Sequence, residues 1–284
     1  MGIEYLGLSS INGPLVILEG VQDAFFDEIV EFTDDGKTKK IGRIIELYED
    51  KAVIQVFEGT ENMSLDNTRT KLTGHPMEVS LAPDMLGRTF NGIGKPIDGL
   101  GPLITDVKRD VNGLPLNPVR RKYPRNYIRT GISAIDGLTT LIRGQKLPIF
   151  SGNGLPHDQL AAQIVKQASL GDGSDEPFAV VFGAMGVKHD VADFFQKTFE
   201  ESGVADHVCM FLNLANDPVV ERLITPKVAL TAAEYLAFDC NMHILVILTD
   251  MTSFAEAMRE VSSSKGEIPS FIRRESDGKT LIGG

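Results

Sequence analysis

The second half of the sequence alternates short apolar runs with amphipathic segments, and this pattern constrains the fold more than any other feature. The runs are "KLPIF", "FAVVFGAM", "HVCMFLNL" and "HILVILT". Their residues are apolar almost without interruption, which is typical of parallel strands buried on both faces rather than of half-exposed strands. Strands that alternate with helices along the chain predict a parallel sheet covered by helices, and therefore an α/β fold.

The segments after the apolar runs carry helix boundary signals. We expect one helix from Pro156 to about Ser169 and another over residues 188–203, which ends at Gly203. A third helix is expected from Pro226. A fourth is expected from Ser253, where Ser253 and Glu256 form the spacing of a capping box.

The first 74 residues carry a different pattern of short strands. "GPLVILEG" is one apolar run bounded by glycines, and "DEIVEFTDDGKTKKIGRIIELYEDKAVIQVFEG" contains further runs. The dipeptide Asp35-Gly36 within "DDGK" is a hairpin signal, and "YEDK" predicts a second turn. Short strands joined by tight turns predict a β-barrel over residues 1–74, followed by the α/β domain over residues 75–284.

From Gly74 onward, glycine and proline interrupt the first part of the α/β domain. "NGIGKPIDGLGPL" and "NGLPLNPVRRKYP" predict loops and extended segments up to about Pro148. A short helix is expected at "SAIDGLTTLIRG", with Ser133 as its N-cap.

Composition excludes several classes of protein. The chain has 284 residues, a net charge of −11 and a pI near 5.0, which argues against nucleic acid as its main partner. Two cysteines, Cys209 and Cys240, do not make a disulfide framework, and no His/Cys cluster has metal-ligand spacing. The N-terminus lacks the pattern of a signal peptide, and the apolar runs are too short to span a membrane. We therefore expect a cytoplasmic soluble protein, or a soluble part of something larger.

The stretch "SGNGLPHDQLAAQI" comes directly after "KLPIF" and begins a predicted helix, which is where a nucleotide-binding protein carries its phosphate loop. An active loop matches the template G-x-x-x-x-G-K-[ST], in which backbone amides and the lysine contact phosphates and the hydroxyl holds magnesium. Aligned on this strand–turn–helix, the four defining positions all differ from the template. They hold Ser151, Pro156, His157 and Asp158.

Each difference has a chemical consequence. Pro156 has no N–H to donate, His157 is shorter than lysine and mostly neutral at pH 7, and Asp158 places a negative charge where a phosphate would lie. Like charges ~4 Å apart repel by about 1 kcal/mol in water and more near a protein surface. We expect no catalysis by this loop, and weak nucleotide binding or none. The loop consists of Ser151, Gly152, Asn153, Gly154, Leu155, Pro156, His157 and Asp158.

The same residues also suit an ordinary strand–turn–helix connection. Proline is favoured at the first position of a helix, and an aspartate in the first turn complements the helix dipole. The residues alone leave both interpretations open. A second candidate for the nucleotide site is Asp250, because an apolar strand that ends in aspartate is the Walker B pattern. Its alternative interpretation is a loop residue near a helix start.

Several longer stretches carry a family resemblance. "FEGTENM", "MLGRTFNGIGKPIDG", "TGISAIDGLTTLIRGQKLPIFSGNGLPHDQLAAQI", "VVFGAMGVKHDVADFF" and "FLNLANDPVVERLITPKVALTAAEYLAF" together resemble the B subunit of the archaeal A-type and vacuolar V-type rotary ATPases. The resemblance covers nearly all of residues 1–270. Intact-loop subunits of these rings also carry G-E-R-G after the next strand, and Ala184 stands here at the position of its glutamate. The resemblance favours a degenerate phosphate loop over a chance turn.

The B subunit is the non-catalytic, regulatory partner of the catalytic A subunit. The resemblance implies an N-terminal β-barrel, a RecA-like P-loop-type domain and a C-terminal helical domain. It also implies a ring in which A and B subunits alternate, with central and peripheral stalk subunits, at the cytoplasmic face of the membrane. ATP or ADP with Mg would bind at the interface with the catalytic subunit, and this chain itself would require no cofactor.

The sequence departs from the family after Ser270. "FIRRESDGKTLIGG" does not resemble the corresponding part of the B subunit, so the RecA-like domain is expected to be truncated at its C-terminal end, without the helical domain. One alternative is a shortened B subunit that serves only in assembly. A less favoured alternative is an active RecA-like ATPase, which would need lysine in place of His157, a hydroxyl in place of Asp158 and glutamate in place of Ala184.

Overall fold

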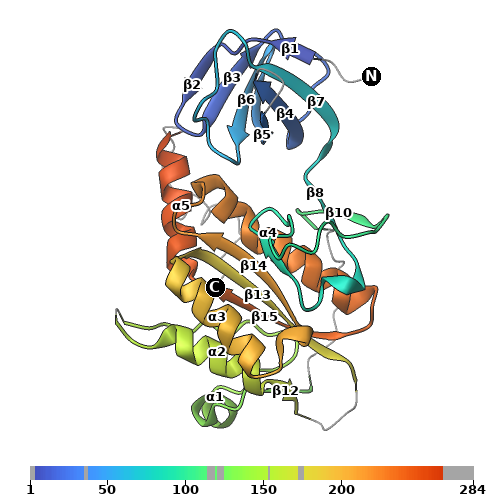
Figure 1. Cartoon of the computed structure of the whole chain (residues 1–284), viewed down its shortest axis with the longest axis vertical. Coiled ribbons are helices and arrows are strands. Elements are labelled where there is room, and N and C mark those ends of the chain that lie inside the picture. The colour runs from blue at the N-terminus through green and yellow to red at the C-terminus, as the bar shows by residue number, and fades with distance from the viewer. Residues whose placement is uncertain are drawn as a thin grey trace.

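A computed structural model shows two units in sequence order, an antiparallel sheet and an α/β domain (Figure 1). Among the described residues, none of the helices has the length and hydrophobicity of a membrane span. The structure describes residues 4–34, 38–113, 119, 125–152, 154–171 and 176–264.

The N-terminal unit is a curled antiparallel sheet with the strand order β1-β7-β4-β5-β6-β3-β2 (Figure 1). One face of it encloses a core that includes Val16, Val30, Phe32, Ile44 and Ile54. The predicted strands and the barrel-type unit are confirmed, whereas the turn predicted at "DDGK" lies largely outside the described residues. The strands are β1 (Glu4–Leu6), β2 (Ser10–Asn12), β3 (Leu15–Glu19), β4 (Glu28–Asp34), β5 (Thr38–Tyr48), β6 (Lys51–Val56) and β7 (Arg69–Pro76). The domain boundary at residue 74 stays a prediction.

The second unit is built on a parallel sheet with the order β15-β13-β14-β9. Parallel pairing and burial on both faces confirm what the uninterrupted apolar runs predicted. Strand β9 comes from the region predicted as loop and extended chain, and it adds a parallel edge beside β14. The strands are β9 (Thr89–Asn91), β13 (Phe178–Val187), β14 (Val208–Leu214) and β15 (His243–Thr249).

Helices cover both faces of this sheet. Apolar residues of α2 and α3 pack with Val180, Phe182 and Leu245 on one face. Residues of α4 and α5 pack with Val181 and Phe211 on the other. In Figure 1, α2 and α3 lie in front of the strands. The helices are α1 (Ser133–Leu138), α2 (His157–Gln167), α3 (His189–Glu201), α4 (Val219–Phe238) and α5 (Met251–Ser264). Two short ladders join β8 (Glu78–Ser80) to β10 (Lys108–Asp110) and β11 (Ile128–Arg129) to β12 (Ser169–Leu170).

The strand predicted at "KLPIF" is wrong. Residues 145–150 have no regular structure, and the side chains of Ile149 and Phe150 are 50% and 93% exposed. An apolar run becomes a strand only where another strand can satisfy its backbone groups. Within the described residues, β15 has β13 as its single neighbour, and no strand lies beside residues 145–150.

Two helix starts also differ from the prediction. Helix α4 begins at Val219, and Pro226 lies inside it rather than at its start. The position of a proline is thus a poor guide here, because the surrounding core holds the helix despite the missing N–H. Ser133 is the first residue of α1 and makes no cap hydrogen bond. The Asp136 carboxylate instead accepts the backbone N–H groups of Thr130 at 2.9 Å and Gly131 at 3.0 Å.

The two units share one hydrophobic core. Ile29 and Phe57 of the N-terminal sheet are buried together with Ile224 and Val228 of α4. The carboxyl group of Glu221, also on α4, is buried in the same region. A shared core fixes how the N-terminal unit sits on the α/β domain.

Candidate functional site

The degenerate phosphate loop forms an exposed turn ahead of α2. Ser151, Gly152 and residues 154–157 are exposed, Asp158 is half-buried, and Asn153 lies outside the described residues. Gly154 has a φ of +80°, which a residue with a side chain rarely adopts. The amide of Leu155 donates to the carbonyl of Gly152 at 3.2 Å. The chain therefore turns back on itself ahead of the helix.

The polar groups of His157 also contact other residues of the loop. The amide of His157 donates to the Leu155 carbonyl at 2.8 Å, and the Nδ1 atom of its ring lies 3.0 Å from the same oxygen. The Nε2 atom of His157 is 3.6 Å from Oδ1 of Asp158. Pro156 precedes the helix and has no N–H. These residues do not fit a triphosphate with magnesium, which needs free amides and a cation facing the phosphates.

Asp250, the second candidate, lies between β15 and α5. Its Oδ1 atom accepts the backbone N–H of Thr252 at 2.9 Å, so the carboxylate contacts the first turn of α5. The capping box predicted at Ser253 is wrong, because α5 begins at Met251 and Ser253 lies inside the helix. In the described part of the chain, no hydrogen bond or ion pair joins Asp250 to the loop at 151–158.

Ala184 lies at the carboxyl end of the sheet, close to Asp250. It is fully buried, and it pairs in register with Leu212 on one side and Thr249 on the other. Its surroundings are those of a packed strand.

A polar cluster that the sequence did not predict lies at the same edge of the sheet. Asn213, near the end of β14, is fully buried, and its Oδ1 atom accepts the amide of Gly186 at 3.1 Å and Nε of Arg222 at 2.9 Å. Arg222 also donates through Nη2 to the carbonyls of Leu214 and Ala215, both at 3.3 Å. The guanidinium of Arg222 therefore holds the end of β14, and Asn213 links that end to β13 through the amide of Gly186.

Gly186 completes this cluster because it leaves room for the arginine. Its φ is +67°, and an added Cβ would lie 2.7 Å from Nε of Arg222 and 2.9 Å from Cβ of Ser253. The Nδ2 atom of Asn213 is buried without a hydrogen-bond partner among the described residues. No motif signals these residues. Their position in the fold signals them, because polar groups just beyond the carboxyl ends of parallel strands gather at one edge of the sheet.

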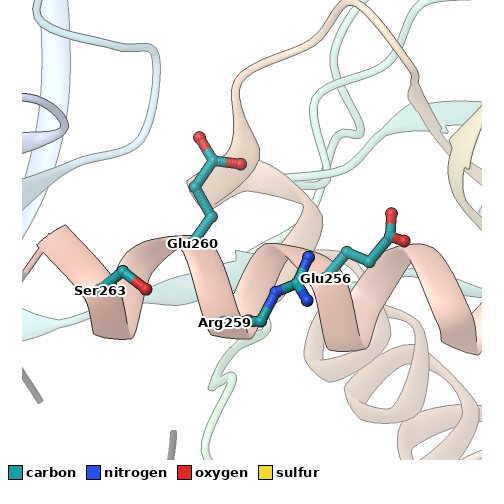
Figure 2. Close-up of a pocket in the computed structure, with 4 residues that line it drawn as sticks. All are labelled: Glu256, Arg259, Glu260 and Ser263. Carbon is teal, nitrogen blue, oxygen red and sulfur yellow. The ribbon is translucent and has the colours of Figure 1, made fainter. Parts of the chain in front are cut away.

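A shallow depression of about 650 Å³ lies along α5 (Figure 2). It is lined by Glu256, Arg259, Glu260 and Ser263, all from this one helix. It includes neither the loop nor Asp250. No group of three or more His, Cys, Asp or Glu side chains in the described residues could hold a metal ion.

Comparison with known proteins matches both units to domains of one family. Residues 8–74 match the beta-barrel domain of the ATP synthase alpha/beta family. Residues 131–273 match the nucleotide-binding domain of the same family. The matches occur in the same order as the two units in the structure, and the second includes the degenerate loop, the polar cluster and Asp250.

Individual relatives are similar over most of this chain. It is 61% identical over 267 residues to the V-type ATP synthase beta chain of Halothermothrix orenii, which covers 94% of this chain and 58% of that protein. The identity is 61% with V-type ATP synthase beta chain 2 of Clostridium tetani, with the same shares covered. It is 54% with the beta chain of Thermotoga neapolitana.

The chain therefore spans a little over half the length of these relatives. The resemblance to the B subunit of the A- and V-type rotary ATPases, predicted from the sequence, is confirmed by these matches. On these grounds the chain belongs to the ATP synthase alpha/beta family.

Proposed function

We propose that this chain acts as the non-catalytic B subunit of a rotary ATP synthase or ATPase. The observation that carries the proposal is the 61% identity to V-type ATP synthase beta chains, in a chain whose phosphate loop has lost its lysine and hydroxyl. In this role it alternates with catalytic subunits in a ring, and it contacts the membrane only through the stalk subunits of the complex.

We assign no reaction step to the residues of this chain. Chemistry at a nucleotide site of this kind needs a cation on the phosphates and a base for the attacking water. His157, Asp158 and Ala184 supply neither, and Arg222 is engaged by Asn213 and backbone carbonyls. ATP or ADP with Mg binds instead at the interface with the catalytic subunit, whose residues perform the chemistry.

The loop itself is proposed as a contact surface for a neighbouring subunit. Leu155 is 56% exposed and Phe150 is 93% exposed, so apolar side chains face outward on both sides of the turn. Exposed apolar side chains that lie near one another are typical of protein–protein contacts.

Reconstitution with the catalytic subunit of a V-type ATP synthase tests this role. We expect an alternating ring on native mass spectrometry, and we expect Leu155→Asp to reduce ring formation. Ile104→Asp is the matched control, because Ile104 is an exposed apolar residue (98%) outside the loop, and it should leave assembly unchanged. A chain that forms no complex with the catalytic subunit would contradict the proposal.

A narrower function is also supported by one observation. The loop lacks the groups for phosphate chemistry but exposes the apolar Phe150 and Leu155, so a module that serves only in assembly is the second candidate. The same reconstitution separates the two functions. A ring that hydrolyses ATP supports the full role, whereas a ring without turnover supports the assembly module.

A further inference from the structure

Four asparagines of the chain are followed directly by glycine, and this dipeptide is chemically reactive. The backbone nitrogen of the glycine can attack the Cγ atom of the asparagine side chain, and glycine has no Cβ to hinder the attack. Asn153 lies outside the described residues, and the structure describes the other three pairs. The four pairs are Asn12-Gly13, Asn91-Gly92, Asn112-Gly113 and Asn153-Gly154.

The fold engages both reacting groups of the pair Asn91-Gly92. The Oδ1 atom of Asn91 accepts the amide of Lys95 at 2.7 Å. The amide of Gly92 donates to Oε1 of Glu221 at 2.9 Å. A Cβ added at Gly92 would collide with the side chains of Thr225 and Glu221, so the backbone has little room to turn. An attack by the Gly92 nitrogen would have to break these contacts first.

The pair Asn112-Gly113 is held in a similar way. The Nδ2 atom of Asn112 donates to the carboxylates of Asp27 and Asp110. Its Oδ1 atom accepts Nζ of Lys227 at 3.0 Å. The amide of Gly113 donates to the Asp110 carbonyl at 3.1 Å. The side-chain amide of Asn112 is therefore fixed between three charged groups, and the attacking nitrogen is also bonded.

The pair Asn12-Gly13 differs from both. The two residues are exposed, and among the described residues neither the side-chain amide of Asn12 nor the N–H of Gly13 makes a hydrogen bond. Gly13 and Pro14 form the turn between β2 and β3, and Gly13 has a φ of +55°. Glycine is favoured at this first position of a two-residue hairpin loop. The turn thus accounts for Gly13 and leaves the side chain of Asn12 without a contact.

The turn can open at Asn12 without disturbing the core. Asn12 is the exposed last residue of β2, a three-residue strand at one end of the sheet. The Gly13 carbonyl accepts Oγ1 of Thr60 at 2.6 Å. The Pro14 carbonyl accepts the amide of Val56 at 2.9 Å. These bonds hold the far side of the turn and use neither reacting group. The ends of edge elements open at low free energy, so the two groups can meet in the folded chain.

We propose that Asn12-Gly13 is a site of spontaneous deamidation in the folded chain. The Gly13 nitrogen loses its proton and forms a bond to Cγ of Asn12, and the side-chain nitrogen leaves as ammonia. The product is a five-membered succinimide. Water then adds to one of its two carbonyls, and the ring opens to aspartate or isoaspartate. The net change exchanges the amide NH2 for a carboxylate oxygen, and water is the single co-reactant.

The modification changes both the charge and the geometry of the turn. Either product adds one negative charge to a chain whose net charge is already −11. Isoaspartate also lengthens the backbone by one carbon between residues 12 and 13. This extra carbon shifts the Gly13 carbonyl away from Thr60, and we expect β2 to lose its pairing with β3. The inference concerns the N-terminal sheet alone and does not depend on the proposed function.

Peptide mapping by mass spectrometry, after incubation of the folded chain at mildly alkaline pH, tests the proposal. Alkaline pH favours the attack because hydroxide removes the proton from the Gly13 nitrogen. Asn12 should convert at least roughly tenfold faster than Asn91 and Asn112, which must first break hydrogen bonds. In guanidinium chloride the three should convert at similar rates, because the dipeptide is the same. Equal rates in the folded chain would overturn the proposal, and so would an Asn12 that converts only after unfolding.

Asn12→Gln separates this site from any other. Glutamine keeps the amide, but its attack would need a larger ring, so we expect no isoaspartate at residue 12. Asn67→Gln is the matched control, because Asn67 is an exposed asparagine of the same unit that is followed by threonine. It should form isoaspartate at residue 12 as the wild type does. Isoaspartate in Asn12→Gln at the wild-type yield would show that the modification lies elsewhere, and the proposal would then be wrong.

Discussion

Glu221 illustrates how a single buried residue sets the charge at the junction of the two units. Its side chain accepts the backbone N–H of Gly92 at 2.9 Å, and the residue is 6% exposed. Burial is the main cause that raises the pKa of its carboxyl to about 7, and the nearby Asp217 and Glu58 carboxylates add to it, while Lys95 opposes them. Near neutral pH the carboxyl is therefore close to half protonated.

This raised pKa predicts that stability falls as pH rises. Between the ordinary pKa of 4.5 and the folded value of about 7, the folded chain keeps a proton that the unfolded chain releases. The stabilisation is fully present below the unfolded pKa and is lost as pH rises through the folded pKa. The total loss is on the order of 3 kcal/mol. Urea unfolding between roughly pH 5 and roughly pH 8 covers this titration. The free energy of unfolding should fall with pH in the wild type and fall less steeply in Glu221→Gln.

Glu201→Gln is the control for this titration, because Glu201 is exposed at the end of α3. It should keep the wild-type slope. If Glu221→Gln and the wild type lose stability equally with pH, the raised pKa of Glu221 is wrong.

Gly186 leads to a second prediction about a single residue. Gly186→Ala places a methyl group against Arg222 and Ser253 in a backbone conformation that alanine disfavours. We expect a loss of about 3 kcal/mol in the free energy of unfolding. Gly203 has a similar φ of +70° with nothing within 4 Å of an added Cβ, so Gly203→Ala should cost only about 1 kcal/mol. Equal losses in the two variants would show that Arg222 does not pack against Gly186.

Among the helices and strands, the start of α5 separates two interpretations of its sequence. The Asp250 carboxylate accepts the amide of Thr252, whereas Ser253 lies inside the helix. We expect Asp250→Ala to destabilise the chain by about 1 kcal/mol, as the loss of a capping group does. Ser253→Ala should change stability by less than about 0.5 kcal/mol. Thermal unfolding of both variants measures the difference. A larger loss of stability in Ser253→Ala than in Asp250→Ala would instead support the capping box.

The elements also show what sequence patterns could and could not predict. The parallel strands were predictable because continuous apolar runs need burial on two faces, and β13 and β14 have it. "KLPIF" has the same pattern but no described strand beside it, and a pattern within one segment does not reveal whether a partner exists. The interior position of Pro226 was missed for a related reason, because packing around α4 outweighs the local cost of proline.

The site was predictable in part. The departure from the phosphate-loop template at Pro156, His157 and Asp158 can be read from residue types alone, and the inactivity that it implies stays a prediction. The contact of Asn213 with Arg222 joins the end of a strand to a helix and depends on how the helix packs. Nothing in the local sequence around either residue specifies that packing.

Across the molecule as a whole, a shared core and several polar contacts join the two units. Lys95 of the α/β domain lies 3.1 Å from Glu58 of the N-terminal unit, and Lys227 of α4 donates to Asn112 at 3.0 Å. Asn112 in turn contacts Asp27 in the N-terminal unit. We expect the two units to unfold in a single transition, and calorimetry that resolves two transitions would contradict this.

Magnesium-dependent ATP hydrolysis by the purified chain tests whether the loop at residues 151–158 is inactive. A non-catalytic member of the family, with His157 and Asp158 in its loop, should show no turnover above the buffer background. Hydrolysis that is present in the wild-type chain and is lost in Asp158→Ala or His157→Ala would contradict a non-catalytic role, because the loop would then be an active site.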